Sequence, residues 1–266
     1  MSKTAITDVL PLLVAMAEDG SLSGVWTKAT GFFATLGFAR CNYGYTRFLH
    51  SKSIGDPNDA LFLTTLGADY TRRYFANGFF ARTPVFRWAQ HNSGACTWAW
   101  VRKALLEGKL SPEEMDALRQ NAEMGITAGI SVSFPDQSWR SKGALGLIAD
   151  PGLDEAAVEL IWAVHRNAIL AVAHSMHLKI TQFPQPSRHR PLTDRQREAL
   201  EWVADGKTAQ DIAILMGVSS AMVEKHLRLA REALNVETTA QAVAKGAIMN
   251  VIFQRGIGTP SQDARL

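Results

Sequence analysis

"LTDRQREALEWVADGKTAQDIAILMGVSSAMVEKHLRLAREALN", residues 192–235, contains three apolar stretches at helical spacing, separated by turn residues. Thr193 stands where a side chain can cap the first helix, and Gly206 where the chain can leave it. Thr208 and Gly217 have the same two roles around the second helix. The stretch therefore predicts three short helices in quick succession.

The third of these helices has one apolar face and one charged face. It is expected to begin at Ser219 or Ser220 and to bury the side chains of Val223, Leu227, Ala230 and Leu234. The charged side chains on its outer face are those of Glu224, Lys225, Arg228 and Arg231. An apolar segment over residues 238–253 predicts a fourth helix, so the unit is all-α.

The short second helix, the turn at Gly217 and the basic third helix have the outline of a helix-turn-helix. An α-helix fits the major groove of DNA, where its side chains contact base edges, and hydroxyls near its N-terminus hold phosphates. On the pattern alone, a generic helical bundle with solvated charges is the alternative.

The chain changes character at TQFPQPSRHRP, residues 181–191, which holds three prolines and almost no apolar side chain. Proline removes a backbone donor and disfavours helix in the residue before it, so this composition predicts a linker. We expect a large unit over residues 1–180, the helical unit over residues 192–253 and a flexible tail over residues 254–266.

Composition points to a soluble globular protein. The 266 residues are 47% hydrophobic and 20% charged, with a net charge of +3 that is too small to establish nucleic-acid binding by itself. The N-terminus lacks the layout of a secretion signal, and no uninterrupted apolar run is long enough for a membrane span. Cys41 and Cys96 match no metal spacing and are expected to be reduced. These features predict a cytoplasmic protein with no membrane partner.

Four motifs in the helical unit resemble the DNA-binding domain of the LuxR family of transcription regulators. They are LTDRQ at 192–196, GKT at 206–208, DIA at 211–213 and VEKHL at 223–227. The resemblance implies a transcription regulator that binds a two-fold promoter site in double-stranded DNA as a homodimer.

This resemblance and the outward face of the third helix together predict which residues contact DNA. Lys207 and Thr208 are expected to hold phosphate, and Ser219 and Ser220 lie at the N-terminus of the reading helix. The predicted reading residues are Glu224, Lys225, His226 and Arg228, with the glutamate able to accept from a cytosine amine.

Two positions depart from the family pattern in a way that concerns DNA. Ala233 and Thr239 stand where the family usually has lysine and arginine, which predicts that one or two phosphate contacts are missing. The departures leave open a protein-interaction module whose helix-turn-helix has lost DNA binding.

Residues 1–180 alternate strands with helices. Strands are expected over residues 38–49, 60–67, 96–101, 128–136 and 143–150, with helices before, between and after them. An α-β-α sandwich over an antiparallel five-stranded sheet fits this order, so the whole chain belongs to the α+β class. The long apolar helix over residues 154–180 is a candidate dimer surface.

This layout resembles the acyl-homoserine lactone sensing domain of the same family. The family's pocket usually has a tryptophan, a tyrosine four residues later, an Asp-Pro pair and a second tryptophan at fixed offsets. These offsets fall on Tyr70, Tyr74, Thr83-Pro84 and Trp98. Tyr74 and Trp98 match, whereas Tyr70 and Thr83 do not. The paired glycines Gly125 and Gly129 also match and are expected to be structural.

In the family, the aspartate accepts from the signal's amide, while the first tryptophan and the tyrosine donate to its carbonyls. Thr83 offers only a neutral acceptor, and Leu66 and Ala149 stand where polar side chains often occur, so the resemblance implies a more apolar pocket. The predicted ligand-binding residues are Leu66, Tyr70, Tyr74, Thr83, Val85, Trp98 and Ala149. The neighbouring aromatic residues are expected to be core: Phe75, Phe79, Phe80, Phe86 and Trp88.

The partners expected are DNA, a second copy of the chain and a small amphipathic signal. The first hypothesis is that this signal is an N-acyl-homoserine lactone. No cofactor, no metal site and no catalytic set of residues is predicted, because no nucleophile stands with a base and the histidines lack acidic partners. A regulator that responds to another apolar compound, or to none, is the alternative.

Overall fold

The computed structural model describes residues 3–50, 54–76, 78–135, 138–185 and 190–253. The chain divides into two compact units, one ending at Phe183 and one starting at Pro184. The predicted tail over residues 254–266 lies outside the described residues.

The first unit is built on one antiparallel sheet of five strands in the order β2-β1-β5-β4-β3. Residues opposite each other include Tyr43 with Leu145 and Ile130 with Leu147, which fixes the register of the central strands. The strands are β1 Arg40–Thr46, β2 Leu61–Thr64, β3 Gly94–Thr97, β4 Gly129–Ser133 and β5 Lys142–Ile148. The predicted α+β class and the five-stranded antiparallel sheet are confirmed.

The third strand is shorter than predicted. The run CTWAWV, residues 96–101, is a strand only to Thr97, and helix α5, Ala99–Leu106, starts directly after Trp98. The Trp98 amide still donates to the Gly129 carbonyl across the sheet at 2.9 Å. A short apolar run does not distinguish a strand from a buried helix, which is why the boundary was misplaced.

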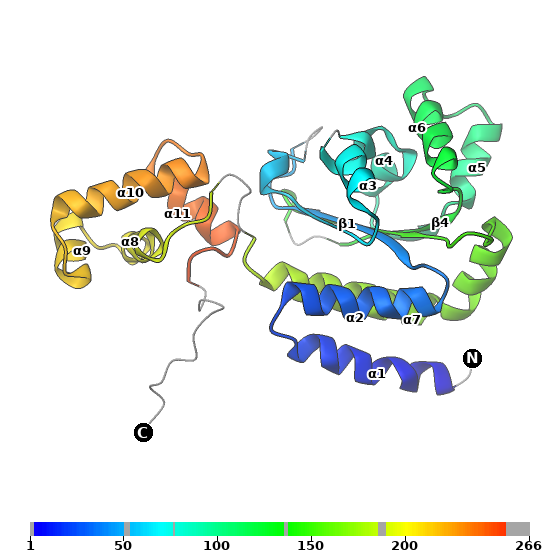
Figure 1. Cartoon of the computed structure of the whole chain (residues 1–266), viewed down its shortest axis with the longest axis horizontal. Helices are drawn as coiled ribbons and strands as arrows, with labels where there is room; N and C mark the ends of the chain where they lie inside the picture. The colour runs from blue at the N-terminus through cyan, green and yellow to red at the C-terminus, as the bar shows by residue number, and fades with distance from the viewer. Residues whose placement is uncertain (1–2, 51–53, 77, 136–137, 186–189, 254–266) are drawn as a thin grey trace. The chain divides into compact units, whose positions relative to one another are not determined.

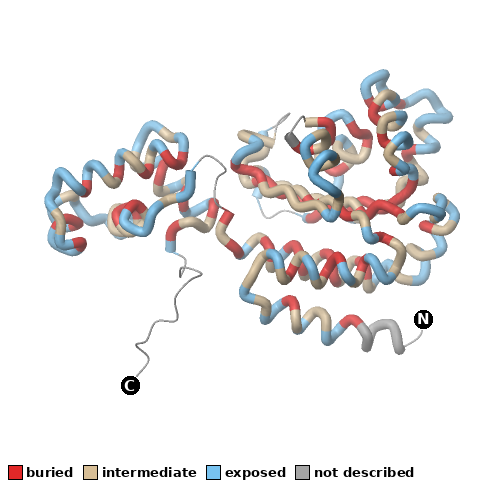
Figure 2. The backbone as a smooth tube through the Cα atoms, in the orientation of Figure 1, coloured by how far each residue is buried: buried red, intermediate tan, exposed pale blue. Residues whose placement is uncertain are grey.

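Three helices cover one face of this sheet: α1 Lys3–Glu18, α2 Leu22–Thr35 and α7 Glu155–Gln182 (Figure 1). Alternate residues of β1, including Cys41 and Tyr43, pack in one core with Ile169 and Met176 of α7. Figure 2 shows this buried layer running along the sheet and α7. Helix α7 is long and apolar enough to cross a bilayer, by length and composition only. One of its sides is instead part of the core.

The other face carries short helical segments on which the functional cavities depend (Figure 1). They are the turn Pro57–Asp59, α3 Ala68–Thr71, the turns Arg72–Ala76 and Phe79–Arg82, α4 Pro84–His91, α5 and α6 Pro112–Glu123.

The second unit has helices α8 Asp194–Ala204, α9 Ala209–Met216, α10 Ser220–Leu234 and α11 Thr239–Ile248. The predicted caps are confirmed: Thr193, Thr208 and Ser219 each accept from the amide three residues on. Gly217 ends α9 at φ 65°, a left-handed conformation that favours glycine. Leu215 is 49% exposed on this helix, and its neighbour Met216 is buried.

The predicted linker of residues 181–191 is described only at its two ends, because residues 186–189 lie outside the described residues. Helix α7 continues to Gln182, and the Gln185 amide donates to the Met249 carbonyl of the second unit at 2.9 Å.

Candidate functional site

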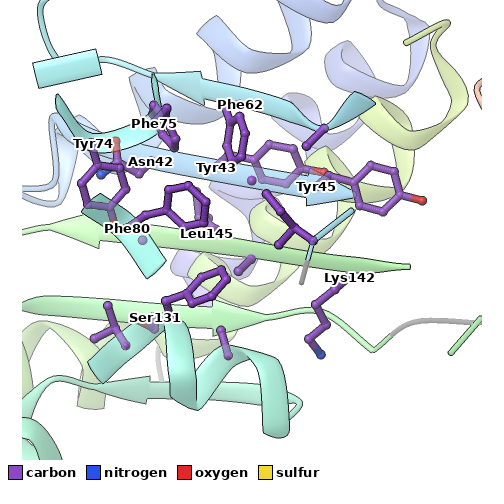
Figure 3. Close-up of a pocket in the computed structure, with 18 of the residues that line it drawn as sticks. Asn42, Tyr43, Tyr45, Phe62, Tyr74, Phe75, Phe80, Ser131, Lys142 and Leu145 are labelled. Carbon is purple, nitrogen blue, oxygen red and sulfur yellow. The ribbon is translucent and has the colours of Figure 1, made fainter. Parts of the chain in front are cut away.

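An apolar cavity of about 120 Å³ lies between the sheet and the helical segments that follow β2. Aromatic rings form much of its wall, with ring centroids 4.6 Å apart for Phe62 and Phe75 and 5.4 Å apart for Phe62 and Phe80 (Figure 3). Phe75 and Phe80 are buried, as predicted for core, and they are at the same time cavity wall.

The strands supply the other side of this cavity because side chains alternate along them. On β5, Ala144, Gly146 and Ile148 line the cavity, and Leu147 packs in the opposite core. The small residues Ala144 and Gly146 leave room above the sheet. Ala149 follows Ile148, so its side chain lies on the same side as that of Leu147 and is buried in the core at 3% exposure. It lines neither this cavity nor the second cavity beside α5 and α6. This corrects its predicted place in the pocket.

Four polar side chains of the cavity are hydrogen-bonded in two pairs, Asn42 with Tyr70 and Trp98 with Ser131. Asn42 Nδ2 donates to the Tyr70 hydroxyl at 2.6 Å and Thr64 Oγ1 donates to Asn42 Oδ1 at 2.7 Å. Trp98 Nε1 donates to Ser131 Oγ at 2.9 Å. These hydrogen bonds occupy donors and acceptors that would otherwise be available to a ligand.

Tyr70 and Tyr74 lie in the cavity wall with their rings stacked, 5.0 Å between centroids and 15° between planes. Burial raises the pKa of the Tyr70 hydroxyl, with a smaller contribution from Tyr74. Burial also raises the pKa of Tyr74 to about 12, against a side-chain hydrogen bond with Thr83. Both phenols are therefore protonated at neutral pH and can donate.

Thr83 and Leu66 lie outside the cavity lined by Tyr70 and Tyr74. Thr83 is 1% exposed and caps α4, its Oγ1 donating to the Phe80 carbonyl at 2.8 Å and accepting from the Phe86 amide at 3.4 Å. It does not line the cavity of Tyr70 and Tyr74. Leu66 lines neither this cavity nor the second cavity, which lies beside α5 and α6. Because its hydroxyl already has these partners, Thr83 acts first as a helix cap.

A second cavity of about 350 Å³ lies beside the first, among α4, α5, α6 and the start of α7. Thr83 lines this one. Four residues border both cavities: Val85, Trp98, Asn121 and Ile126. Of the predicted ligand-binding residues, the structure thus brings Tyr70, Tyr74, Val85 and Trp98 together around the first cavity.

Asn42 and Asn121 are among the cavity residues that sequence reasoning missed. Asn121 is 8% exposed, and its Oδ1 has no hydrogen-bond partner among the described residues. It lies four residues after the buried Ala117 of the same helix, α6. A polar residue on the apolar stripe of a helix is the signal that could have identified it.

Gly129 fixes the position of the Trp98 ring. A Cβ atom at residue 129 would lie 2.3 Å from the Leu147 carbonyl oxygen and 3.0 Å from two atoms of the Trp98 ring. Only a residue without a side chain fits there, so the structural role predicted for this glycine is confirmed.

The outer face of α10 in the second unit is charged and exposed. Ser219, Ser220, Glu224, Lys225 and Arg228 are exposed, and His226 is half-buried. The Arg228 guanidinium forms an ion pair with Glu232 one turn further along the same face. The helix therefore presents a row of donors and acceptors at the surface.

The segment before α9 is exposed at Lys207 and Thr208. The Thr208 side chain donates to Asp211 Oδ2 at 2.7 Å and accepts from the Asp211 amide. The side-chain bond lowers the pKa of Asp211, as does the bond from the Thr208 amide. Phosphate contact by Thr208 stays a prediction, because its hydroxyl is already engaged by the capping box.

The two residues that depart from the family pattern, Ala233 and Thr239, do not lie on the exposed face of α10. Ala233 is 1% exposed, so it does not belong to the outer surface of α10. Thr239 accepts a hydrogen bond from Arg231 at 2.9 Å. Neither residue removes a charge from the row formed by Lys225 and Arg228.

Comparison with known families gives two matches that together span most of the chain. The sequence model described as "Autoinducer binding domain" matches residues 21–180. The model described as "Sigma-70, region 4" matches residues 189–234, which include α8, α9 and α10.

Individual relatives agree with these matches. The transcriptional activator protein SolR of Ralstonia solanacearum is 30% identical over 226 residues, covering 82% of this chain and 87% of SolR. The quorum sensing-dependent transcriptional regulator RpaR of Rhodopseudomonas palustris is 28% identical over 189 residues, covering 69% and 72%. Among solved structures, CepR2 of Burkholderia cenocepacia has a TM-score of 0.51 at 17% identity, covering 67% of this chain and 96% of CepR2, and shares the fold.

Proposed function

We propose, from the premise that this chain belongs to the LuxR family of quorum-sensing transcription regulators, that its first unit binds an N-acyl-homoserine lactone and its second reads a two-fold promoter site. Members of the family regulate transcription and are not enzymes. The match of an autoinducer-binding domain to the residues that enclose the aromatic cavity is the observation that carries the proposal.

The chemistry of the cavities supports an amphipathic ligand. The first cavity is apolar over most of its wall and suits an acyl chain, with Phe62 and Phe80 as contacts. The protonated hydroxyls of Tyr70 and Tyr74 can donate to carbonyl groups. The alternative, a regulator that needs no lactone, is favoured by the internal pairing of Asn42 with Tyr70 and of Trp98 with Ser131.

Lactone binding is expected to stabilise the purified protein. A ligand at one hundred times its dissociation constant adds about 2.7 kcal/mol to the free energy of unfolding. For a unit of this size, that corresponds to a rise of roughly 5 to 10 °C in melting temperature. Differential scanning fluorimetry with short-chain and long-chain lactones measures it. If none of them shifts the transition, the lactone proposal is wrong and the alternative stands.

The DNA-binding part of the proposal rests on α10, whose exposed residues have the composition of a reading helix. Lys225 and Arg228 carry positive charge on the exposed face, and Glu224 can accept from a base. Ser219 and Ser220 lie at the N-terminus of the helix, where backbone amides favour phosphate. The exposed Lys207 is assigned to phosphate as well.

Replacing Arg228 by alanine is expected to weaken promoter binding. One lost guanidinium contact costs roughly 1 to 3 kcal/mol, or about fivefold to more than a hundredfold in affinity. A mobility-shift titration at fixed salt measures it. Arg119→Ala is the matched control, because Arg119 is also exposed and paired with an acidic residue, Asp116, in the first unit. Equal binding by Arg228→Ala and the wild type would remove Arg228 from the DNA interface.

A two-fold promoter site requires two copies of the reading helix, so we include a homodimer and a cytoplasmic location in the proposal. Helix α7 exposes Leu160, Val164 and Leu178, and α1 exposes Leu10 and Val14. Exposed apolar side chains on two helices of one layer support an association surface there.

A further inference from the structure

Asn121 is the one buried side chain bordering both cavities that has an unpartnered oxygen in the described structure. The Oδ1 atom is shielded from solvent and accepts no hydrogen bond, although the residue is 92% buried, the complement of its 8% exposure. A buried carbonyl without a donor destabilises the folded state relative to a paired one. We expect such a side chain to form its missing hydrogen bond in another state of the protein, such as a ligand-bound state.

The place of Asn121 indicates what that partner is. Asn121, Trp98, Val85 and Ile126 form the boundary between the two cavities. Two other polar side chains near the boundary are occupied: the Trp98 indole donates to Ser131, and the Thr83 hydroxyl caps α4. Of these three side chains, only Asn121 keeps an unused acceptor, its Oδ1.

We propose that Asn121 is the ligand's hydrogen-bond anchor and selects molecules that present an N–H or O–H donor on an apolar chain. The inference rests on the proposed function, because an acyl-homoserine lactone carries such a donor in its amide. The two cavities then serve as two chambers of one site. The aromatic chamber takes the chain, and the chamber beside α5 and α6, which also contains Arg102 and Glu155, takes the more polar end.

The substitution Asn121→Leu tests the anchor. Calorimetric titration compares N-octanoyl-homoserine lactone with its ester analogue, in which oxygen replaces the amide N–H. The wild type is expected to prefer the amide by roughly threefold to tenfold. Asn121→Leu is expected to bind both alike. If the variant keeps the full preference, the donor is recognised elsewhere and the anchor assignment is overturned.

A second measurement needs no ligand. Leucine in place of an unpartnered amide is expected to raise the melting temperature of the ligand-free protein, since the side chain borders two cavities and has room. Asn42→Leu is the matched control. Its amide lines the same cavity but is bonded to Tyr70 and Thr64, so this variant is expected to melt lower. A lower melting temperature for Asn121→Leu would mean that the amide is satisfied within the folded chain, which overturns the proposal.

Failure of the lactone hypothesis has a different signature. If the wild type binds neither lactone probe, the proposed ligand class is wrong, and the anchor is then tested with 1-decanol and its methyl ether. Preference for the alcohol that Asn121→Leu abolishes supports the anchor. Binding of neither compound, or a preference that survives the substitution, overturns it.

Discussion

Gly129→Ala is expected to destabilise the first unit by roughly 3 kcal/mol, because an added Cβ collides with backbone and has nowhere to go. The nearest atom, the Leu147 carbonyl oxygen, would be 2.3 Å away and belongs to a central strand of the sheet. The next nearest, two atoms of the Trp98 ring at 3.0 Å, belong to a side chain held by its bond to Ser131. For a unit of this size, the melting temperature falls by about 10 °C.

Gly146→Ala is the matched control for this substitution. Gly146 lies on β5, directly opposite Ser131 of β4, yet a Cβ atom there would approach no atom closer than 3.9 Å. It would extend into the first cavity. Thermal unfolding of the two variants is expected to show a large loss for Gly129→Ala and a small change for Gly146→Ala. Equal melting temperatures would mean that the sheet relaxes around residue 129 and that this glycine does not position Trp98.

The helical unit could be predicted closely because local signals bound each of its helices. Thr193, Thr208 and Ser219 all bond to an amide three residues further on, so each start depends only on adjacent sequence. The buried face of α9 is less clear from the sequence, because this helix has apolar residues on more than one face. The helical period then allows either Leu215 or Met216 to be buried, and packing against the other helices decides between them.

The cavity was predicted less completely because its geometry depends on tertiary pairing. Tyr74 and Trp98 were found from their spacing, but the bond between Asn42 and Tyr70 joins residues 28 positions apart and leaves no local signal. Ala149 was assigned to the wrong side because a one-residue difference along a strand reverses the face. The oxygen of Asn121 is unpartnered because no other element of the described structure places a hydrogen-bond donor beside it, and adjacent sequence does not reveal this.

The stability of the first unit is expected to fall as the pH drops from 7 to 5, because of His177. This side chain is 6% exposed and its ring is stacked on Phe134 with centroids 4.0 Å apart. His177 Nδ1 is 2.9 Å from the Tyr43 hydroxyl. Burial, and then electrostatic repulsion from His174 and Lys142, lower the pKa of His177 to about 4 from the ordinary 6.5. The folded state therefore holds this imidazole neutral at pH 5.

The direction of the pH effect follows from proton uptake. Well above pH 6.5 the imidazole is neutral in both states and contributes no pH dependence. Between pH 6.5 and 4 the unfolded chain binds a proton that the folded chain does not, so unfolding becomes more favourable. The loss is about 2 kcal/mol at pH 5 and approaches about 3 kcal/mol below pH 4.

Urea unfolding at pH 7 and pH 5 measures this loss, and His177→Gln removes its source. Glutamine keeps a polar partner for Tyr43 but does not titrate, so the variant is expected to lose about 2 kcal/mol less than the wild type between the two pH values. His174→Gln is the control, because His174 also contacts Phe134 but is only half-buried, and it should keep most of the wild-type loss. A wild-type pH dependence in His177→Gln would show that the histidine is already solvated and charged in the folded protein. The stacked ring and the Tyr43 bond argue against that outcome, since both hold the imidazole inside a core that excludes water.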